Sequence, residues 1–314
     1  MLTHLIILLD DTSVSYCHYS VPQAEHRLIG LDYLKAGIVW AMKENLNIQF
    51  VYPDYELPAE YNEAIESIDH IKIKPETQAE DADVVVQNGW KSVASNTLQN
   101  ATCIIRSSRR ELAEHMTVIK DLLNKVSRLN VVLTDVEEFT DADIDSYKKI
   151  LAQLSDIVDN QLKSGRKLQL NLLTDRLMLD EMNNCNAGVN NVTLAPDGQF
   201  YLCPAYYYDK LKESVGDLKQ GLRIKNSQLL SLDHAPICRR CDAWHCRRCV
   251  WLNEHLTLDI NTPSHQQCVM AHLERNASRD LLVRWEQEGI KYASTNRIEE
   301  IEELDPFNTY NQWK

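Results

Sequence analysis

Glycine is scarce in this sequence, and glycine-rich phosphate-binding loops are missing. Only 9 of the 314 residues are glycine, and neither a GxGxxG nor a GxxxxGKT pattern follows any apolar segment. Nucleotide-binding folds need such loops because their backbone N–H groups must approach phosphates closely. The nucleophile-elbow and HExxH spacings are missing too. We therefore expect neither a nucleotide-binding fold nor an independent hydrolase.

Basic charge and long apolar runs are also lacking. The formal net charge is -13 at pH 7, whereas binding to nucleic acid or to an anionic membrane requires a basic surface. The apolar run Leu5–Leu9 is too short to span a bilayer, and it has neither a basic leader nor a small-residue cleavage site. We expect a cytoplasmic protein that binds no nucleic acid and no membrane.

The first half of the chain alternates between apolar runs and amphipathic segments. This alternation favours a parallel sheet with right-handed crossovers, either open or curled into a partial barrel. Strands are predicted over residues 4–9, 47–52, 71–74, 83–86, 102–105, 130–133 and 167–172, and helices over residues 26–46, 109–126 and 141–162.

The nine cysteines are unevenly distributed. In a reducing cytoplasm, clustered cysteines indicate metal ligation or redox chemistry rather than disulfides. Cys17 and Cys103 stand alone in the first half, where buried thiols are the simplest interpretation. The other seven lie within residues 185–268 and are Cys185, Cys203, Cys238, Cys241, Cys246, Cys249 and Cys268.

The spacing Cys238-x2-Cys241-x4-Cys246-x2-Cys249 places four thiolates within a dozen residues. Each CxxC pair lets two sulfurs approach one metal from a tight turn. Zinc ribbons usually have longer spacers between their pairs, so the crowding favours an iron-sulfur cluster. Purely architectural zinc remains the alternative, because the ligand spacings of different metals overlap.

The cysteine segment resembles the SPASM domain, which carries the auxiliary clusters of radical SAM enzymes that mature ribosomal peptides. The resemblance covers residues 185–270 and rests on the order Cys185-x12-Gly198-x4-Cys203, the compact four-cysteine run and the last lone Cys268. The Pro-Asp-Gly turn of residues 196–198 and the Gly-Asp-Leu segment of residues 216–218 also match. The family's run is commonly CxxCx5Cx3C, so this chain has shorter spacers.

The resemblance implies two [4Fe-4S] clusters. One would be held by four thiolates, from Cys238, Cys241, Cys246 and Cys268. The other would have only three thiolates, from Cys185, Cys203 and Cys249. The open iron of this second cluster could bind a substrate thiol, a water molecule or a side chain such as His245.

Radical SAM enzymes carry CxxxCxxC directly after their first strand, and this chain has no such triplet. Asp10 and Val14 occupy the first two positions of that register, and Cys17 the third. The first half is therefore interpreted as a degenerate radical SAM domain that does not bind S-adenosylmethionine. With its cysteine-rich tail, it resembles the CXXX-repeat peptide maturases.

The expected fold is α/β, a partial (β/α) barrel of radical SAM type followed by a small cysteine-rich, SPASM-like iron-sulfur domain. We expect these domains over residues 1–180 and 181–272, and a C-terminal helix with an acidic tail over residues 273–314. The resemblance implies an iron-sulfur protein that modifies a ribosomally made, cysteine-containing precursor peptide together with a radical SAM enzyme. Alternatives are a stand-alone enzyme that uses the open cluster and a zinc-stabilised scaffold for protein interactions.

Charged residues flank these features. Arg239, Arg240, Arg247 and Arg248 are expected to offset the negative charge of a thiolate cluster rather than to bind nucleic acid. The acidic stretch Glu299–Asp305 predicts a solvated helix face, or a dock for a basic leader peptide or a partner subunit.

Overall fold

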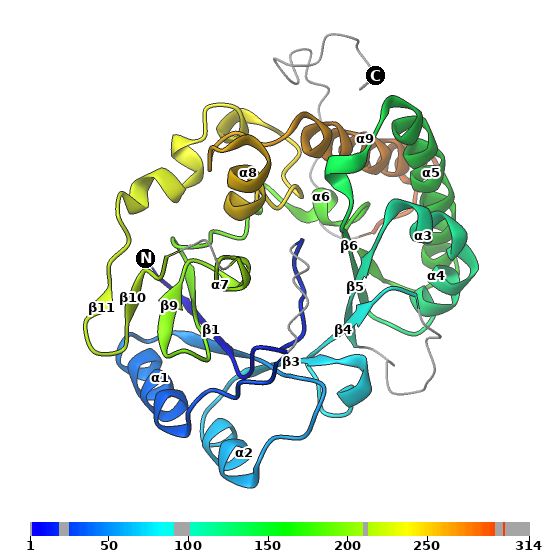
Figure 1. The fold of residues 1–314 in the computed structure, drawn as a ribbon. Coiled ribbons are helices and arrows are strands. Elements are labelled where there is room, and N and C mark those ends of the chain that lie inside the picture. The colour runs from blue at the N-terminus through cyan, green and yellow to red at the C-terminus, as the bar shows by residue number, and fades with distance from the viewer. Residues whose placement is uncertain (1, 19–24, 91–100, 210–212, 293–297, 299–314) are drawn as a thin grey trace. The chain divides into compact units, whose positions relative to one another are not determined.

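The computed structural model describes residues 2–18, 25–90, 101–209, 213–292 and 298 (Figure 1). The chain has an α/β fold whose strands are mostly parallel. It divides into two compact units, each made of two chain segments: residues 1–87 with 186–231, and residues 88–185 with 232–314. The acidic stretch Glu299–Asp305 lies outside the described residues.

The strands of the first unit alternate in sequence with its helices, as expected. A parallel set runs in the order β8-β1-β2-β3-β4, and an antiparallel set continues from β8 through β9 and β10 to β11. The central strand β1 (His4–Leu8) pairs with β2 (Asn47–Val51) on one side and with β8 (Asn191–Leu194) on the other. The remaining strands are β3 (Ile71–Pro75), β4 (Val84–Asn88), β9 (Gln199–Tyr201), β10 (Gly216–Asp217) and β11 (Gly221–Leu222).

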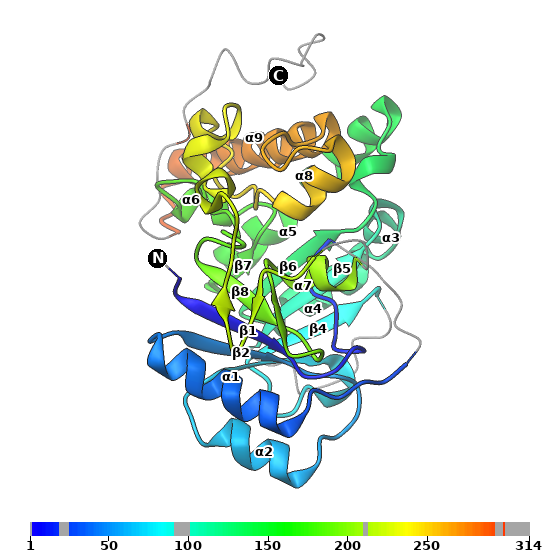
Figure 2. The same cartoon turned by 60° about the vertical axis from the view of Figure 1, so that its left-hand side comes forward.

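Helices α1 (Leu31–Lys43) and α2 (Ala59–Glu66) lie along the parallel strands of this unit (Figure 2). Leu34, Ile38 and Ala41 are spaced at helical intervals, so they form one buried face of α1. This face joins the apolar side chains of β1, β2 and β8 in one core. Two short helical segments are η1 (Glu76–Gln78) and η4 (Ser227–Leu230), and α7 (Pro204–Tyr208) follows β9.

The second unit has a parallel set β5-β6-β7 and most of the helices. Its strands are β5 (Thr102–Ser107), β6 (Arg128–Leu133) and β7 (Gln169–Leu170). Its helices are α3 (Arg109–Glu114), α4 (Met116–Leu123), α5 (Asp141–Lys163), α6 (Asp175–Met178), α8 (Val250–Thr257) and α9 (His265–Gln287), with the short segments η3 (Val136–Glu138), η5 (Leu232–His234) and η6 (Cys238–Arg240).

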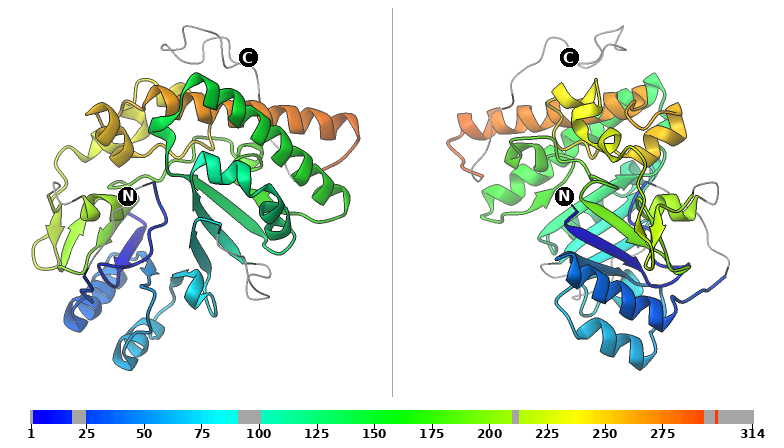
Figure 3. Two further views of the ribbon diagram at one scale, coloured as in Figure 1. Left: turned by 45° about the vertical axis from the view of Figure 1, so that its right-hand side comes forward. Right: turned by 90° about the vertical axis from the view of Figure 1, so that its left-hand side faces the viewer.

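The two longest helices of the second unit, α5 and α9, pack against each other (Figure 3). Trp285 of α9 is buried, and its indole N–H donates a 2.9 Å hydrogen bond to the carboxylate of Asp159 on α5. Ser278 of α9 donates to the carbonyl oxygen of Leu173 at 2.7 Å. These polar contacts orient α9, whose first turns carry part of the cysteine segment.

The predicted strands are confirmed, although β7 is shorter than residues 167–172. The helix predicted over residues 109–126 is broken, because His115 leaves the helical conformation at φ -109° and ψ 25°. No glycine or proline marks that break, so helix propensity could not reveal it. The helix predicted to begin at residue 26 begins at Leu31, and α2 was not predicted. The boundaries at residues 180 and 272 stay predictions.

An antiparallel hairpin forms over the Pro-Asp-Gly turn of residues 196–198 in the first unit. β8 and β9 pair through Leu194 and Phe200. Gly198 lies in the turn at φ +77°, a conformation that glycine adopts readily. β10, at the Gly-Asp-Leu segment, pairs with β9.

Among the described residues, we find no helix that combines the length and the apolar character needed to cross a membrane.

Gly37 provides a test of the packing between α1 and the strands of the first unit. A Cβ atom at this position would lie less than 3.0 Å from the Leu194 side chain, whose residue is fully buried. Gly37→Ala should gain about 1 kcal/mol in helix propensity but lose about 1–3 kcal/mol through overpacking. We expect a net decrease in the free energy of unfolding, measured by urea denaturation.

Ala36→Gly is the matched control, because Ala36 is on the exposed face of the same helix. Its effect should be the propensity loss of about 1 kcal/mol alone. A Gly37→Ala protein more stable than the parent would contradict the packing at this position.

Candidate metal centre

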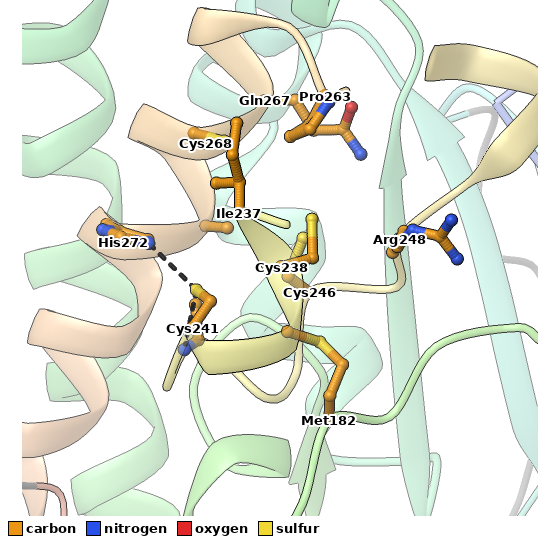
Figure 4. A pocket seen from close by; sticks show the side chains of 12 residues that line it. Met182, Ile237, Cys238, Cys241, Cys246, Arg248, Pro263, Gln267, Cys268 and His272 are labelled. Atoms are coloured by element: carbon orange, nitrogen blue, oxygen red, sulfur yellow. Dashed lines mark hydrogen bonds between the residues drawn. The ribbon is translucent and has the colours of Figure 1, made fainter. Parts of the chain in front are cut away.

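Four cysteines line one cavity in the second unit (Figure 4). They are Cys238, Cys241, Cys246 and Cys268, the set that the SPASM resemblance assigns to one cluster. About 430 Å³ of the cavity, including its opening to solvent, is free of protein atoms. Its other lining residues are Met182, Ile237, Ala243, Arg248, Pro263, Gln267, Ala271 and His272.

Local backbone turns bring the first three of these cysteines together. In η6, the N–H of Cys241 donates to the carbonyl oxygen of Cys238 at 3.1 Å. A second turn follows, where the N–H of Cys246 donates to the carbonyl oxygen of Ala243 at 2.9 Å. The CxxC and Cx4C spacings are therefore each closed by a tight turn that keeps the sulfurs at one cavity.

The fourth cysteine of the cavity comes from a helix. Cys268 lies in the first turn of α9, which begins after the N-cap residue Ser264. The Ser264 hydroxyl accepts a 3.2 Å hydrogen bond from the N–H of Gln267, as is typical of an N-cap. Figure 4 shows Cys268 on α9, opposite the segment that carries the other three cysteines.

The cysteines assigned to the second cluster are distributed over both units. In the second unit, the Cys185 thiol is 3.7 Å from the carbonyl oxygen of Arg248. Cys249 precedes α8, and its sulfur accepts a hydrogen bond from the N–H of Leu252 at 3.4 Å. Burial, and to a lesser extent the nearby Cys185, raises the pKa of the Cys249 thiol to about 12. Cys203 lies in the first unit, directly before α7.

The thiols of the cavity are in an environment that disfavours negative charge. Burial raises the pKa of Cys241 to about 11, and it raises the pKa of Cys246 well above its usual value. Neighbouring cysteines act in the same direction on Cys246. Deprotonation of several of these thiols therefore requires a compensating positive charge, as a bound metal provides.

Three buried arginines surround the cysteine segment. Arg176, Arg248 and Arg275 are only 2%, 3% and 1% exposed. Asp242 supplies one buried carboxylate, whose Oδ1 lies 2.5 Å from Nη1 of Arg275. Burial lowers the pKa of both Arg176 and Arg248, which shows the cost of keeping these cations away from water. Asp242 pairs with Arg275, and Arg248 is the one of these three arginines that lines the cavity. A cation at its wall favours an anionic group in the cavity.

The arginines also hold the cysteine loop in place. Arg176 donates from Nε to the carbonyl oxygen of Asp242 at 2.6 Å. Its guanidinium lies 3.8 Å from the ring centre of Trp244, a cation–π contact within the loop between Cys241 and Cys246. The loop is therefore clamped by side chains from α6 and α9.

His272 contacts the sulfur of Cys241. Nε2 of His272 lies 3.2 Å from that sulfur, and the N–H of Ala243 donates to the same sulfur at 3.4 Å (Figure 4). Burial, with Arg275 and His245 nearby, lowers the pKa of His272 to about 3. The sequence interpretation missed His272, although its position four residues after Cys268 places both on one helix face.

Other residues singled out in the sequence lie differently. His245 is buried, and its Nε2 lies 3.1 Å from Glu274, while the cavity lining does not include it. Of the four arginines near the cysteine run, Arg248 lines the cavity. The other three, Arg239, Arg240 and Arg247, are exposed. Arg176 and Arg275, which are distant from the run in sequence, were missed.

Within the described ranges, no three cysteine, histidine, aspartate or glutamate side chains form a group suited to one metal ion. Sulfurs around a tetrahedral zinc lie about 3.8 Å apart, since each Zn–S bond is about 2.3 Å long. The four cysteines of the cavity therefore line a common space without forming such a compact group.

In the first unit, a polar network surrounds Asp10, the residue at the first position of the expected CxxxCxxC register. Asp10 follows β1 and is fully buried. Its carboxylate accepts hydrogen bonds from the N–H of Thr12 at 2.8 Å, from the hydroxyl of Thr12 at 2.6 Å and from the hydroxyl of Tyr55 at 2.8 Å. Val14 is buried beside it, and Cys17 is partly buried. Asp10 is thus already satisfied by protein donors.

No model of a known protein family matches the chain, and no curated protein matches its sequence.

The ion pair between Asp242 and Arg275 should be essential for folding of the cysteine loop. Removing one partner of a buried pair leaves an uncompensated charge, which typically costs about 3–5 kcal/mol. We expect Asp242→Asn to lower the free energy of unfolding by this amount, measured by urea denaturation. The double variant Asp242→Leu/Arg275→Met should lose less than the sum of the two single variants.

The exposed pair Arg110–Glu114 is the control, with nitrogen and oxygen 2.7 Å apart. Glu114→Gln should leave the free energy of unfolding nearly unchanged, because water screens exposed pairs. An Asp242→Asn protein as stable as this control would show that the buried pair does not stabilise the loop.

Proposed function

We propose that this chain is an iron-sulfur protein that takes part in the modification of a ribosomally made peptide, together with a radical SAM partner. The observation that carries the proposal is the cavity lined by Cys238, Cys241, Cys246 and Cys268. Arg248 at its wall favours an anionic group, and a thiolate-bound cluster would be anionic. This combination supports iron-sulfur binding better than any other feature of the chain.

The cavity fits a four-iron cluster in three respects. It offers four soft thiolate donors, the ligand type that such clusters require. The cysteines reach the cavity from the loop of residues 238–246 and from α9, so their thiolates would approach a cluster from two segments of the chain. Arg248 lines the cavity, and its positive charge would offset the negative charge of the bound thiolates.

We assign Cys185, Cys203 and Cys249 to a second cluster with three protein thiolates. The nearness of Cys185 to Cys249 supports this assignment for two of the three. The open position would be available to a substrate thiol, and a cysteine-containing peptide would provide one. When bound, clusters of this kind supply single-electron transfer or a Lewis-acidic iron.

The first half of the chain supports a partner-dependent role. Its parallel strands alternate with helices, as in the partial barrel of a radical SAM domain spanning residues 1–180. At the register of the catalytic cysteines, however, it carries Asp10 and Val14, and the Asp10 carboxylate is already hydrogen bonded. We infer that S-adenosylmethionine chemistry begins on another polypeptide. This chain, in the cytoplasm, would bind the peptide and transfer electrons or position the substrate.

Two other functions are consistent with parts of the site. A stand-alone enzyme would use the three-thiolate cluster without a partner. A zinc-stabilised scaffold would use the same cysteines for folding only. Metal analysis separates the scaffold from the two iron-sulfur alternatives.

Anaerobic purification of the full chain should yield about eight iron and eight sulfide per protein, the content of two four-iron clusters. The double variant Cys241→Ser/Cys246→Ser should lose about half of this iron, because only one cluster depends on those thiolates. Iron, acid-labile sulfide and zinc should be measured on the same samples.

Cys103→Ser is the matched control, because Cys103 is a buried cysteine of β5 outside the proposed ligand sets. Its iron content should equal that of the parent. Stoichiometric zinc without labile sulfide in the parent protein would rule out the iron-sulfur proposal.

The reduced protein alone should not cleave S-adenosylmethionine, because it has no triplet of thiolates with the CxxxCxxC spacing. Cleavage and peptide modification should require a co-purifying radical SAM enzyme, and both products can be followed by mass spectrometry. Adding the chain to that enzyme should increase the yield of modified peptide. Peptide modification by this chain alone would instead support the stand-alone enzyme.

A further inference from the structure

His272 lines the same cavity as the four cysteines and brings an imidazole nitrogen close to one of their sulfurs. It lies on α9 four residues after Cys268, so both side chains project from the same helix face. Figure 4 shows both residues on α9, with His272 directed toward Cys241. The 3.2 Å separation between Nε2 of His272 and the sulfur of Cys241 is within hydrogen-bonding range.

The chemistry of a bound thiolate determines the direction of this hydrogen bond. A cysteine that ligates a cluster has lost its proton, so its sulfur can only accept. A neutral imidazole has one N–H, and the contact is attractive only if Nε2 carries that hydrogen. Cys241 would then accept two hydrogen bonds, from His272 and from the N–H of Ala243, which is 3.4 Å away.

We propose that His272 is a positioning residue that donates a hydrogen bond to the Cys241 thiolate and raises the reduction potential of the cluster in this cavity. The inference rests on the proposed iron-sulfur function and deepens it. Hydrogen bonds to cluster sulfurs stabilise the reduced, more negatively charged state. The four-thiolate cluster is thereby tuned to accept an electron more readily than cysteine ligation alone would allow.

This role differs from direct ligation. A four-iron cluster in this cavity already has one thiolate for each iron, from Cys238, Cys241, Cys246 and Cys268. The His272 nitrogen contacts a sulfur rather than occupying a separate position in the ligand set. Removing the His272 imidazole should therefore change the reduction potential of the cluster and leave the iron content of the protein unchanged.

The test compares His272→Leu, which has no donor, with His272→Gln, which retains an N–H. His255→Leu is the control, because His255 is an exposed histidine of α8. The full chain is purified anaerobically, its iron is counted, and midpoint potentials are measured by redox titration with EPR detection. We expect the Leu variant to keep its iron and to show a more negative potential for one cluster. The Gln variant should restore most of this shift, and the control should show none.

Each outcome has a distinct meaning. A Leu variant with full iron and an unchanged potential would overturn the hydrogen-bond role alone. Loss of iron in both His272 variants, but not in the control, would overturn it in favour of ligation. Iron-free parent protein would refute the proposed function itself, and with it this inference.

If the His272→Leu variant does not fold, a measurement on the parent protein still tests the proposal. Pulsed EPR of the reduced protein labelled with 15N-histidine should show one weak nitrogen coupling that disappears in His272→Gln. Strong coupling would indicate an iron–nitrogen bond, and absence of any coupling would contradict the proposal.

Discussion

The balance of buried charge around the cysteine segment is the constraint on which the second unit depends. Arg176 and Arg275 approach the loop between Cys241 and Cys246 from α6 and α9, and both contact Asp242. Arg248 brings a third guanidinium to the cavity wall. Buried cations are costly unless they are compensated. Asp242 compensates Arg275, and Asp259 lies near Arg248. The cluster that we propose would add negative charge beside Arg248, and its binding would then be coupled to folding of the loop.

The need to compensate a buried charge also applies to Asp10 in the first unit. Asp10 follows the central strand at the register where a radical SAM domain would place its first cluster cysteine. Its carboxylate is buried, but hydrogen bonds from Thr12 and Tyr55 compensate it fully. The first unit thus hydrogen bonds its buried carboxylate internally, whereas we propose that the second unit binds an external anionic group. Because of this difference, we propose that S-adenosylmethionine chemistry takes place on a partner protein and that this chain transfers electrons.

Within the proposed centre, the four thiolates and His272 have separable roles. The cysteines would bind iron, and the imidazole would adjust how readily the bound cluster accepts an electron. The helical spacing of Cys268 and His272 couples the two roles, because one face of α9 presents both groups. The position of that face depends on distant contacts, such as the hydrogen bond between Trp285 and Asp159. A change in the packing of α5 against α9 would therefore alter the cysteine site.

The sequence by itself predicted the strands and the four cysteines that line the cavity. Apolar runs such as residues 4–9 and 102–105 predict strands because a buried parallel strand needs apolar side chains on both faces. The close spacing of Cys238, Cys241 and Cys246 predicts a common site because short loops keep their sulfurs together. Only the tertiary structure could add Arg176, Arg275 and His272, since helix packing rather than sequence proximity places them at the loop. It also decided the break at His115, where no residue of low helix propensity marks the end of a helix.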